Sequence, residues 1–154
     1  MALRDRFSEN LKQAMKARDA RRVSTLRLVF AGIQDREIRS EKPEPALSED
    51  EIIALLARMI KQREESASTY ESAGRPELAA AEREEIAIIR EFMPRRLSEA
   101  ETVEAIRQVV AETGATSPKD MGKVMATLKQ RHTGSIDFAR AGALVKELLA
   151  TARA

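Results

Sequence analysis

The chain has 154 residues, 43% of them hydrophobic, which is enough to bury a core in one ordinary domain or two small ones. It contains no cysteine, which excludes disulfides, thiolate nucleophiles and cysteine-ligated metals, and no apolar run approaches the roughly 20 residues that a membrane span needs. We therefore expect a cytoplasmic protein that needs no cofactor, is not secreted and does not enter a membrane.

The net charge of +2 hides a sorted distribution, because residues 1–40 carry +5, residues 41–114 carry −7 and residues 115–154 carry +4. Cationic segments attract phosphates and an acidic segment repels them, so any contact with nucleic acid should use the two ends of the chain. Only 3% of the residues are aromatic. Stacking on unpaired bases is therefore disfavoured as a mode of recognition.

The first 40 residues have the apolar spacing of two amphipathic helices, with one hydrophobic residue every three or four positions. The two expected stripes are Leu3, Phe7, Leu11 and Met15, and then Val23, Leu26, Phe30 and Ile33. A loop containing Pro43 and Pro45 follows, because proline removes a backbone donor and biases its predecessor toward extended conformations.

A long helical hairpin is predicted next. Ser48 and Glu51 have the spacing of a capping box, and the helix that they open runs toward Gly74, a length of roughly 40 Å. Gly74 and Pro76 mark a turn into a returning antiparallel helix. Its expected packing face is Leu78, Ala81, Ile88, Ile89 and Phe92. We place a domain boundary at Pro94, which ends this helix.

Three shorter helices are predicted after the boundary. A second capping box, Ser98 with Glu101, opens the first of them, and Gly114 stops it. Ser117 and Pro118 open the second, and the third begins near Phe138 and ends the chain. The predicted fold is therefore all-α, with an N-terminal helical domain over 1–94 that contains the hairpin and a small three-helix domain over 95–154.

The inventory of catalytic groups is poor. The single histidine, His132, lies at a predicted helix end, where a surface role is expected. Glu82, Glu84 and Glu85 fit a solvated helix face that pairs with lysines and arginines three or four residues away. No phosphate loop, helical metal motif or serine elbow occurs, so we expect no metal site, no small-molecule substrate and no catalysis by this chain alone.

Two basic clusters remain as candidate sites. The first, near the junction of the two N-terminal helices, suits phosphates or merely keeps the protein soluble, and it consists of Arg18, Arg21, Arg22 and Arg27, with Arg36 and Arg39 further along. The second, in the tail, consists of Lys119, Gly122, Lys123, Lys129 and Arg131.

Gly122 needs an explanation, because glycine inside a helix costs about 1 kcal/mol relative to alanine. Close packing against the last helix, with Gly142 as its counterpart, is the favoured reading. Close approach of a nucleic-acid backbone is the alternative.

Several segments together resemble the YqeY family over nearly the whole chain. They are Ser24–Ile33, Ile60–Ser66, Ala73–Arg75, Glu85–Ile86 and Phe92–Pro94. The tail is similar to the tail domain of GatB, a subunit of the glutamine-dependent tRNA amidotransferase, in Lys119–Met125, in the Gly134 loop and in Leu144–Leu148. The sequence departs from the family pattern at Phe92, Met93 and Thr127, each a conservative change.

The resemblance implies an accessory protein that binds tRNA, because the GatB tail domain engages the body of the tRNA. Lys119, Gly122, Lys123, Lys129 and Arg131 are the residues to which it carries that contact. Components of an amidotransferase or of an aminoacyl-tRNA synthetase are the implied protein partners. Carbon–nitrogen ligase chemistry belongs to the relative, since neither its kinase nor its amidase machinery is present. The alternative is a helical protein–protein interaction module without RNA contact.

Overall fold

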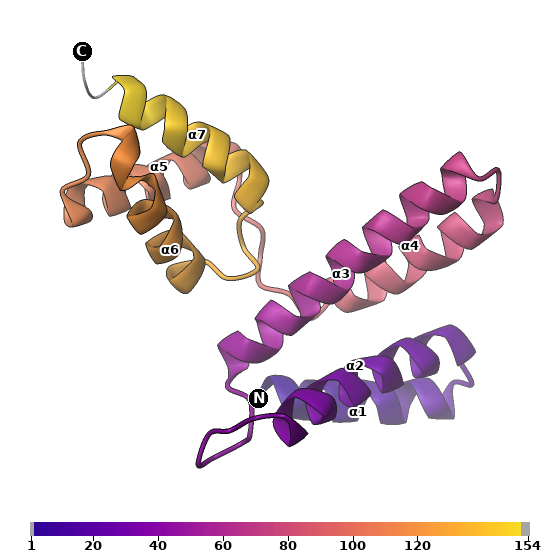
Figure 1. Ribbon diagram of the computed structural model, residues 1–154. Coiled ribbons are helices and arrows are strands. Elements are labelled where there is room, and N and C mark those ends of the chain that lie inside the picture. The colour runs from indigo at the N-terminus through magenta and orange to yellow at the C-terminus, as the bar shows by residue number, and fades with distance from the viewer. Residues whose placement is uncertain (1, 152–154) are drawn as a thin grey trace. The chain divides into compact units, whose positions relative to one another are not determined.

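The computed structural model describes residues 2–151, and within them every regular element is a helix (Figure 1). In chain order these are α1 (Leu3–Lys16), α2 (Ala20–Ile38), α3 (Glu49–Ser72), α4 (Pro76–Arg90), α5 (Glu99–Thr113), the 3-10 helix η1 (Pro118–Asp120), α6 (Met121–Arg131) and α7 (Phe138–Thr151). The predicted all-α class is confirmed for this range, in which no strand occurs. None of these helices has the length and apolarity to cross a membrane.

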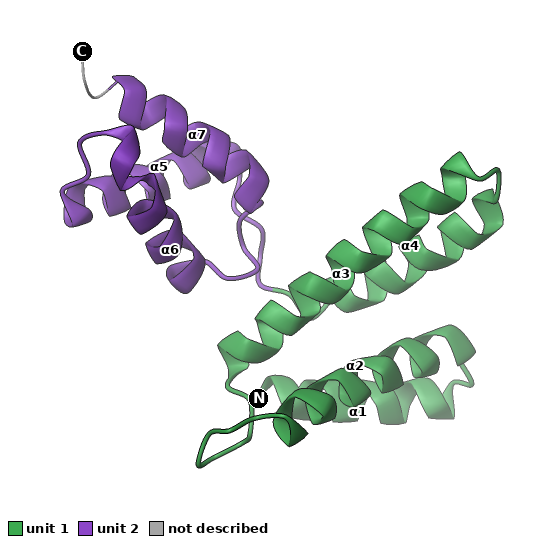
Figure 2. Ribbon diagram, viewed as in Figure 1, with its two compact units in different colours: residues 1–93 green, residues 94–154 purple. Residues whose placement is uncertain are grey.

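The chain separates into two compact units, residues 1–93 and 94–154 (Figure 2). The first contains α1 to α4 and the second contains α5 to α7. Each unit has its own buried apolar cluster. That each unit folds independently as a domain stays a prediction.

In the first unit α3 and α4 lie side by side and run in opposite directions (Figure 1). The predicted capping box is present, since the Glu51 amide donates to Ser48 Oγ at 3.2 Å and the Ser48 amide donates to Glu51 Oε2 at 2.9 Å. The connecting turn uses Gly74 at φ 73°, which a residue with a side chain rarely adopts. α3 has 24 residues and is therefore about 36 Å long.

Two residues that the sequence placed in the core of the first unit, Met15 and Leu78, are exposed. Met15 is 50% exposed, and Ala14 takes the buried place on α1. The reason is helical geometry: Ala14 lies 11 residues, or three turns, from Leu3, whereas a strict step of four drifts off the face. Leu78 is likewise exposed, because it is Ala79 that packs inward from the start of α4.

Ion pairs join the helices of this unit. Glu85 accepts a hydrogen bond from Arg63 Nε at 3.1 Å, with both side chains less than one-fifth exposed, and Arg21 of α2 lies 3.9 Å from the same carboxylate. Glu84 pairs with Arg21 as well. The expectation that these glutamates pair along their own helix is wrong, because their side chains turn toward the neighbouring helices and meet arginines there.

The second unit begins with the other predicted capping box, in which Ser98 and Glu101 exchange hydrogen bonds at 3.1 Å. Gly114 ends α5 in the left-handed conformation, at φ 69°. The connection before α5 is tied to the loop before α7 by a hydrogen bond from the Leu97 amide to the Ser135 carbonyl, at 2.8 Å. The predicted end of the last helix, residues 152–154, lies outside the described residues.

The partly buried ion pair between Arg63 of α3 and Glu85 of α4 should contribute more to stability than an exposed ion pair. Glu85→Gln should lower the free energy of unfolding by about 1–3 kcal/mol, because Arg63 loses a charged partner in a partly buried site. The matched control is Glu71→Gln, which breaks the half-exposed pair with Arg83 and should cost clearly less, because water screens this pair. Urea unfolding of the three proteins measures both values, and equal costs would contradict the ranking.

The capping box of α5 should be sensitive to acid. A hydrogen bond from Arg95, and then the Ser98 amide, lower the pKa of Glu101 from 4.5 to about 2. Because the folded state has the lower pKa, the charged carboxylate stabilises it above pH 4.5, and this contribution is lost as the pH falls toward 2. The thermal midpoint of wild type should therefore exceed that of Glu101→Gln at about pH 6, with the difference shrinking below pH 4.5. A difference that persists at pH 2 would rule this out.

Candidate nucleic-acid interface

The three lysines of the tail lie exposed on η1 and α6. Lys119 belongs to η1, and Lys123 and Lys129 belong to α6. The ion pairs found among residues 94–151 are formed by Arg95, Arg131 and Arg140, and none of them involves these lysines. Their ammonium groups are therefore free to meet an external anion.

Arg131 is placed differently from the lysines. Its guanidinium pairs with Glu112 of α5, which raises the pKa of Arg131 by hydrogen bonding and by charge. Gly122 and Lys129 are seven residues apart and so lie on the same side of α6, two turns apart, whereas Arg131 is two further positions, about 200°, around the helix. Gly122 and Lys129 thus share one side of α6, Lys123 lies about 100° around the helix from Gly122, and Arg131 is committed to a contact within the fold.

The surroundings of Gly122 contradict the prediction that it packs closely against the last helix. It is the second residue of α6 and is exposed, and no heavy atom lies within 4 Å of a Cβ placed on it. Close packing against Gly142 is therefore wrong. Gly142 does face α6, but a Cβ placed on it would lie 3.8 and 3.9 Å from the terminal methyls of Met121 and Met125. Flexible methionine side chains fill the space between these helices.

The loop in front of α6 is fixed by Asp120. Its carboxylate accepts hydrogen bonds from the amides of Thr116, at 2.9 Å, and Ser117, at 3.2 Å. These bonds, with a smaller contribution from the charge of Lys123, lower the pKa of Asp120. Asp120 therefore stays ionised at neutral pH and holds the start of α6, where Lys119 and Gly122 lie.

Lys129 is also held in place, because its ammonium group lies 6.0 Å from the centre of the Phe138 ring on α7. A cation at this distance from an aromatic face is attracted to it, and the attraction leaves the remaining donors of the ammonium group accessible. Lys129 can therefore contact an anion and its ring at the same time.

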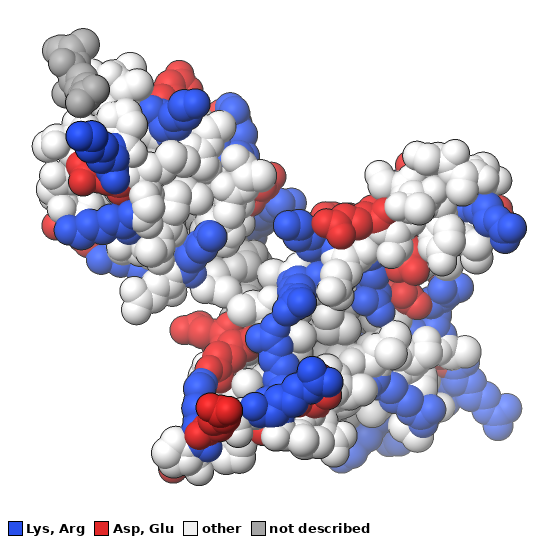
Figure 3. Space-filling view, in the orientation of Figure 1, with Lys and Arg blue, Asp and Glu red and all other residues white. Residues whose placement is uncertain are grey.

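The N-terminal arginine cluster is only partly available. Arg21 pairs with Glu84 and Glu85, and Arg22 bridges Glu91, at 2.5 Å, and Asn10, at 2.8 Å. Arg18 and Arg27 are exposed and take no part in the ion pairs of the described chain, with Arg18 in the left-handed region at φ 54°. Two arginines of the cluster are thus held by contacts within the fold, and two are available at the surface. Basic and acidic side chains lie intermingled over the face seen in Figure 3.

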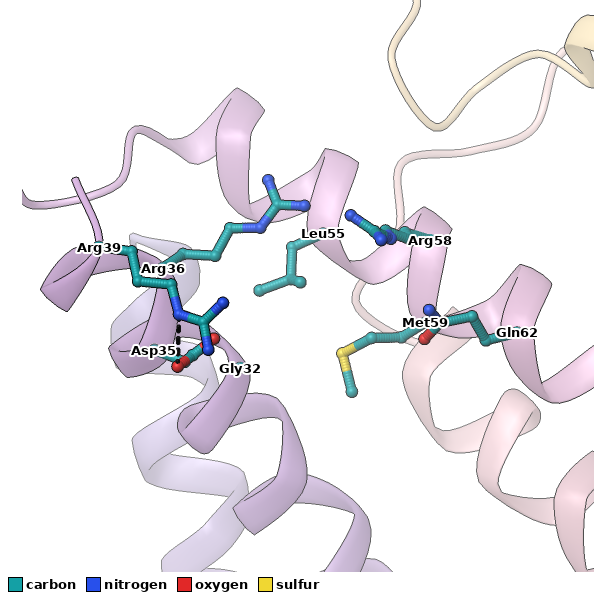
Figure 4. Close-up of a pocket in the computed structure, with 8 residues that line it drawn as sticks. All are labelled: Gly32, Asp35, Arg36, Arg39, Leu55, Arg58, Met59 and Gln62. Carbon is teal, nitrogen blue, oxygen red and sulfur yellow. Dashed lines mark ion pairs between the residues drawn. The ribbon is translucent and has the colours of Figure 1, made fainter. Parts of the chain in front are cut away.

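A further basic surface combines two arginines named from the sequence with one that was not. Arg36 of α2, Arg39 at its C-terminal cap and Arg58 of α3 line one groove of about 540 Å³, together with Gln62 (Figure 4). Its apolar part consists of Leu55 and Met59. The signal available in the sequence was the i, i+3 spacing of Arg36 and Arg39, but only the packing of α3 against α2 adds Arg58.

Metal-ligating side chains are scattered in the part of the chain that the structure describes. No cluster of three or more histidine, aspartate and glutamate side chains there could hold a metal ion. His132 follows the last residue of α6, and its amide donates to the Leu128 carbonyl at 2.9 Å.

Comparison with known proteins gives one family. The model of the family described as Yqey-like protein matches residues 4–149, which is nearly the whole chain and both units. No curated protein matches the chain.

Gly122→Ala should raise the free energy of unfolding by up to about 1 kcal/mol, because alanine favours helix and its methyl group enters open space. Gly114→Ala is the matched control at a helix end, and it should destabilise the protein because Gly114 has a positive φ of 69°. Thermal unfolding measures whether each variant is more or less stable than wild type. Destabilisation by Gly122→Ala would mean that the space around Gly122 is not open.

Proposed function

Since the chain belongs to the YqeY-like protein family, we propose that it is an accessory protein that binds tRNA through the second unit. The observation that carries this proposal lies on η1 and α6: three exposed lysines take no part in the ion pairs of residues 94–151, and the exposed Gly122 lies between Lys119 and Lys123 in the chain. Lysines supply charge to phosphates, and the bare backbone at Gly122 lets a phosphodiester chain come close.

The resemblance of the tail sequence to the GatB tail domain, which is itself part of this proposal, points to the same assignment, because it includes Lys119–Met125, the segment with Lys119, Gly122 and Lys123. In this proposal the helical hairpin and the three-helix tail are two domains, and the tail makes the RNA contact in the cytoplasm. The hairpin domain would meet a component of an amidotransferase or of an aminoacyl-tRNA synthetase.

The proposed contact is electrostatic, so its affinity should fall as the salt concentration rises. Each lysine that neutralises a phosphate releases roughly 0.7–0.9 of a counterion, so three lysines account for a slope of about 2–3 in the logarithm of affinity against the logarithm of salt concentration. No aromatic side chain need stack on a base. The contact would therefore position the tRNA body rather than read its sequence.

The test is the affinity for total tRNA as a function of salt. Changing Lys119, Lys123 and Lys129 to alanine should weaken binding roughly a hundredfold at about 0.1 M salt and reduce the slope by about 2–3. The control variant changes Lys12, Lys16 and Lys146 to alanine, three exposed lysines that lie elsewhere and remove the same charge. Fluorescence anisotropy with labelled tRNA measures both.

Equal loss in the two triple variants would show attraction by net charge alone and contradict a site on α6. Absence of tRNA binding at low salt would also contradict the proposal. It would leave the protein-interaction module as the better account, recognised by capture of a synthetase or amidotransferase subunit that persists at high salt.

A further inference from the structure

The groove between α2 and α3 combines charge and an apolar surface in one place. Leu55 and Met59, both less than one-tenth exposed, form its apolar part, and Gly32 of α2 lies beside them. A Cβ added at Gly32 would lie 3.5 Å from Leu55 Cδ2 and 3.9 Å from Met59 Sδ. The missing side chain at position 32 therefore keeps this part of the groove open.

The charges of the groove are unbalanced. Figure 4 shows the guanidinium groups of Arg36 and Arg58 extending toward each other from α2 and α3, above Leu55. The one carboxylate of the groove, Asp35, is already paired with Arg39, at 3.2 Å. Neither Arg36 nor Arg58 takes part in the ion pairs or side-chain hydrogen bonds of residues 2–151, although most arginines of this unit do.

Two unpaired guanidinium groups on opposite walls of a groove make the space between them positively charged, which favours an anion there. A guanidinium presents its donors in a planar fork that matches the oxygens of phosphate and carboxylate, and two such forks from opposite sides suit a group with several oxygens. The Gln62 amide adds a donor and an acceptor at the same wall. The unpaired positive charge of the groove therefore favours a ligand that carries a phosphate group.

The volume points to more than inorganic phosphate. About 540 Å³ lies within the range of roughly 300–1,000 Å³ that small-molecule sites have. The base of a nucleoside would meet the small exposed part of Leu55 and Met59, where a methyl group and a polarisable sulfur can contact the ring. A phosphorylated nucleoside thus matches both parts of the groove.

We propose that the groove between α2 and α3 binds a nucleotide, with its phosphate between Arg36 and Arg58 and its base on Leu55 and Met59. The nucleotide is either a free mononucleotide or one residue of an RNA chain, since both present the same chemistry. The proposal does not depend on the lysines of α6, which belong to the other unit.

The experiment is a titration of the ¹⁵N-labelled full chain with adenosine 5′-monophosphate, adenosine, inorganic phosphate and a short single-stranded RNA. The monophosphate should shift the Nε resonances of Arg36 and Arg58 and the side-chain amide of Gln62, and adenosine should not. Arg36→Gln with Arg58→Gln should weaken binding at least about tenfold. Because neither arginine takes part in an ion pair or side-chain hydrogen bond of the described residues, this variant should unfold at about the same temperature as wild type.

The control changes Arg18 and Arg27 to glutamine, which removes the same charge from the same unit and should leave the affinity unchanged. The triple lysine variant of α6 should also bind the monophosphate normally, which separates this proposal from the tRNA contact. If only RNA shifts Arg36 and Arg58, the groove is a nucleotide site for RNA. Absence of shifts with every ligand, equal weakening in both arginine variants, or equal binding of adenosine would overturn the proposal.

Discussion

The ion pair between Arg63 and Glu85 is the contact around which the first unit is arranged. It joins the middle of α3 to α4 in a partly buried place, and Arg21 approaches the same glutamate from α2. A charge in such a place is costly without a partner, so a register of α3 and α4 that separated Arg63 from Glu85 would be disfavoured. In the observed register, Arg58 and Gln62 of α3 line the groove beside α2.

Arginine and lysine have different roles in this protein. Arginines form nearly all of the ion pairs within the described residues, and most of these pairs join different helices. The lysines of η1 and α6 stay outside this network. The difference follows from chemistry, because the guanidinium fork holds a carboxylate in a defined geometry, whereas an ammonium group is a hydrated point charge on a flexible stem. An arginine in a basic cluster of this sequence is therefore a candidate for RNA contact only if it forms no ion pair within the fold.

The two proposed surfaces use these residues in different ways. On α6 the charge is carried by free lysines around an open backbone, which suits a phosphodiester chain that needs no fixed orientation. In the groove two arginines converge over an apolar surface, which suits a smaller ligand held in one orientation. The match to the YqeY-like family covers residues 4–149, and both surfaces lie within this range.

The sequence by itself determined the features that depend on short stretches of chain. The all-α class, both capping boxes and the positive-φ glycines at Gly74 and Gly114 all follow from residues within four positions of each other. Only the tertiary structure decided which side of a helix is inside, as at Ala14 and Ala79, and that Gly122 faces open space. It also decided that Glu85 meets Arg63 and that Arg58 joins Arg36, because residues more than 20 positions apart become neighbours only when helices pack, and no local pattern specifies that register.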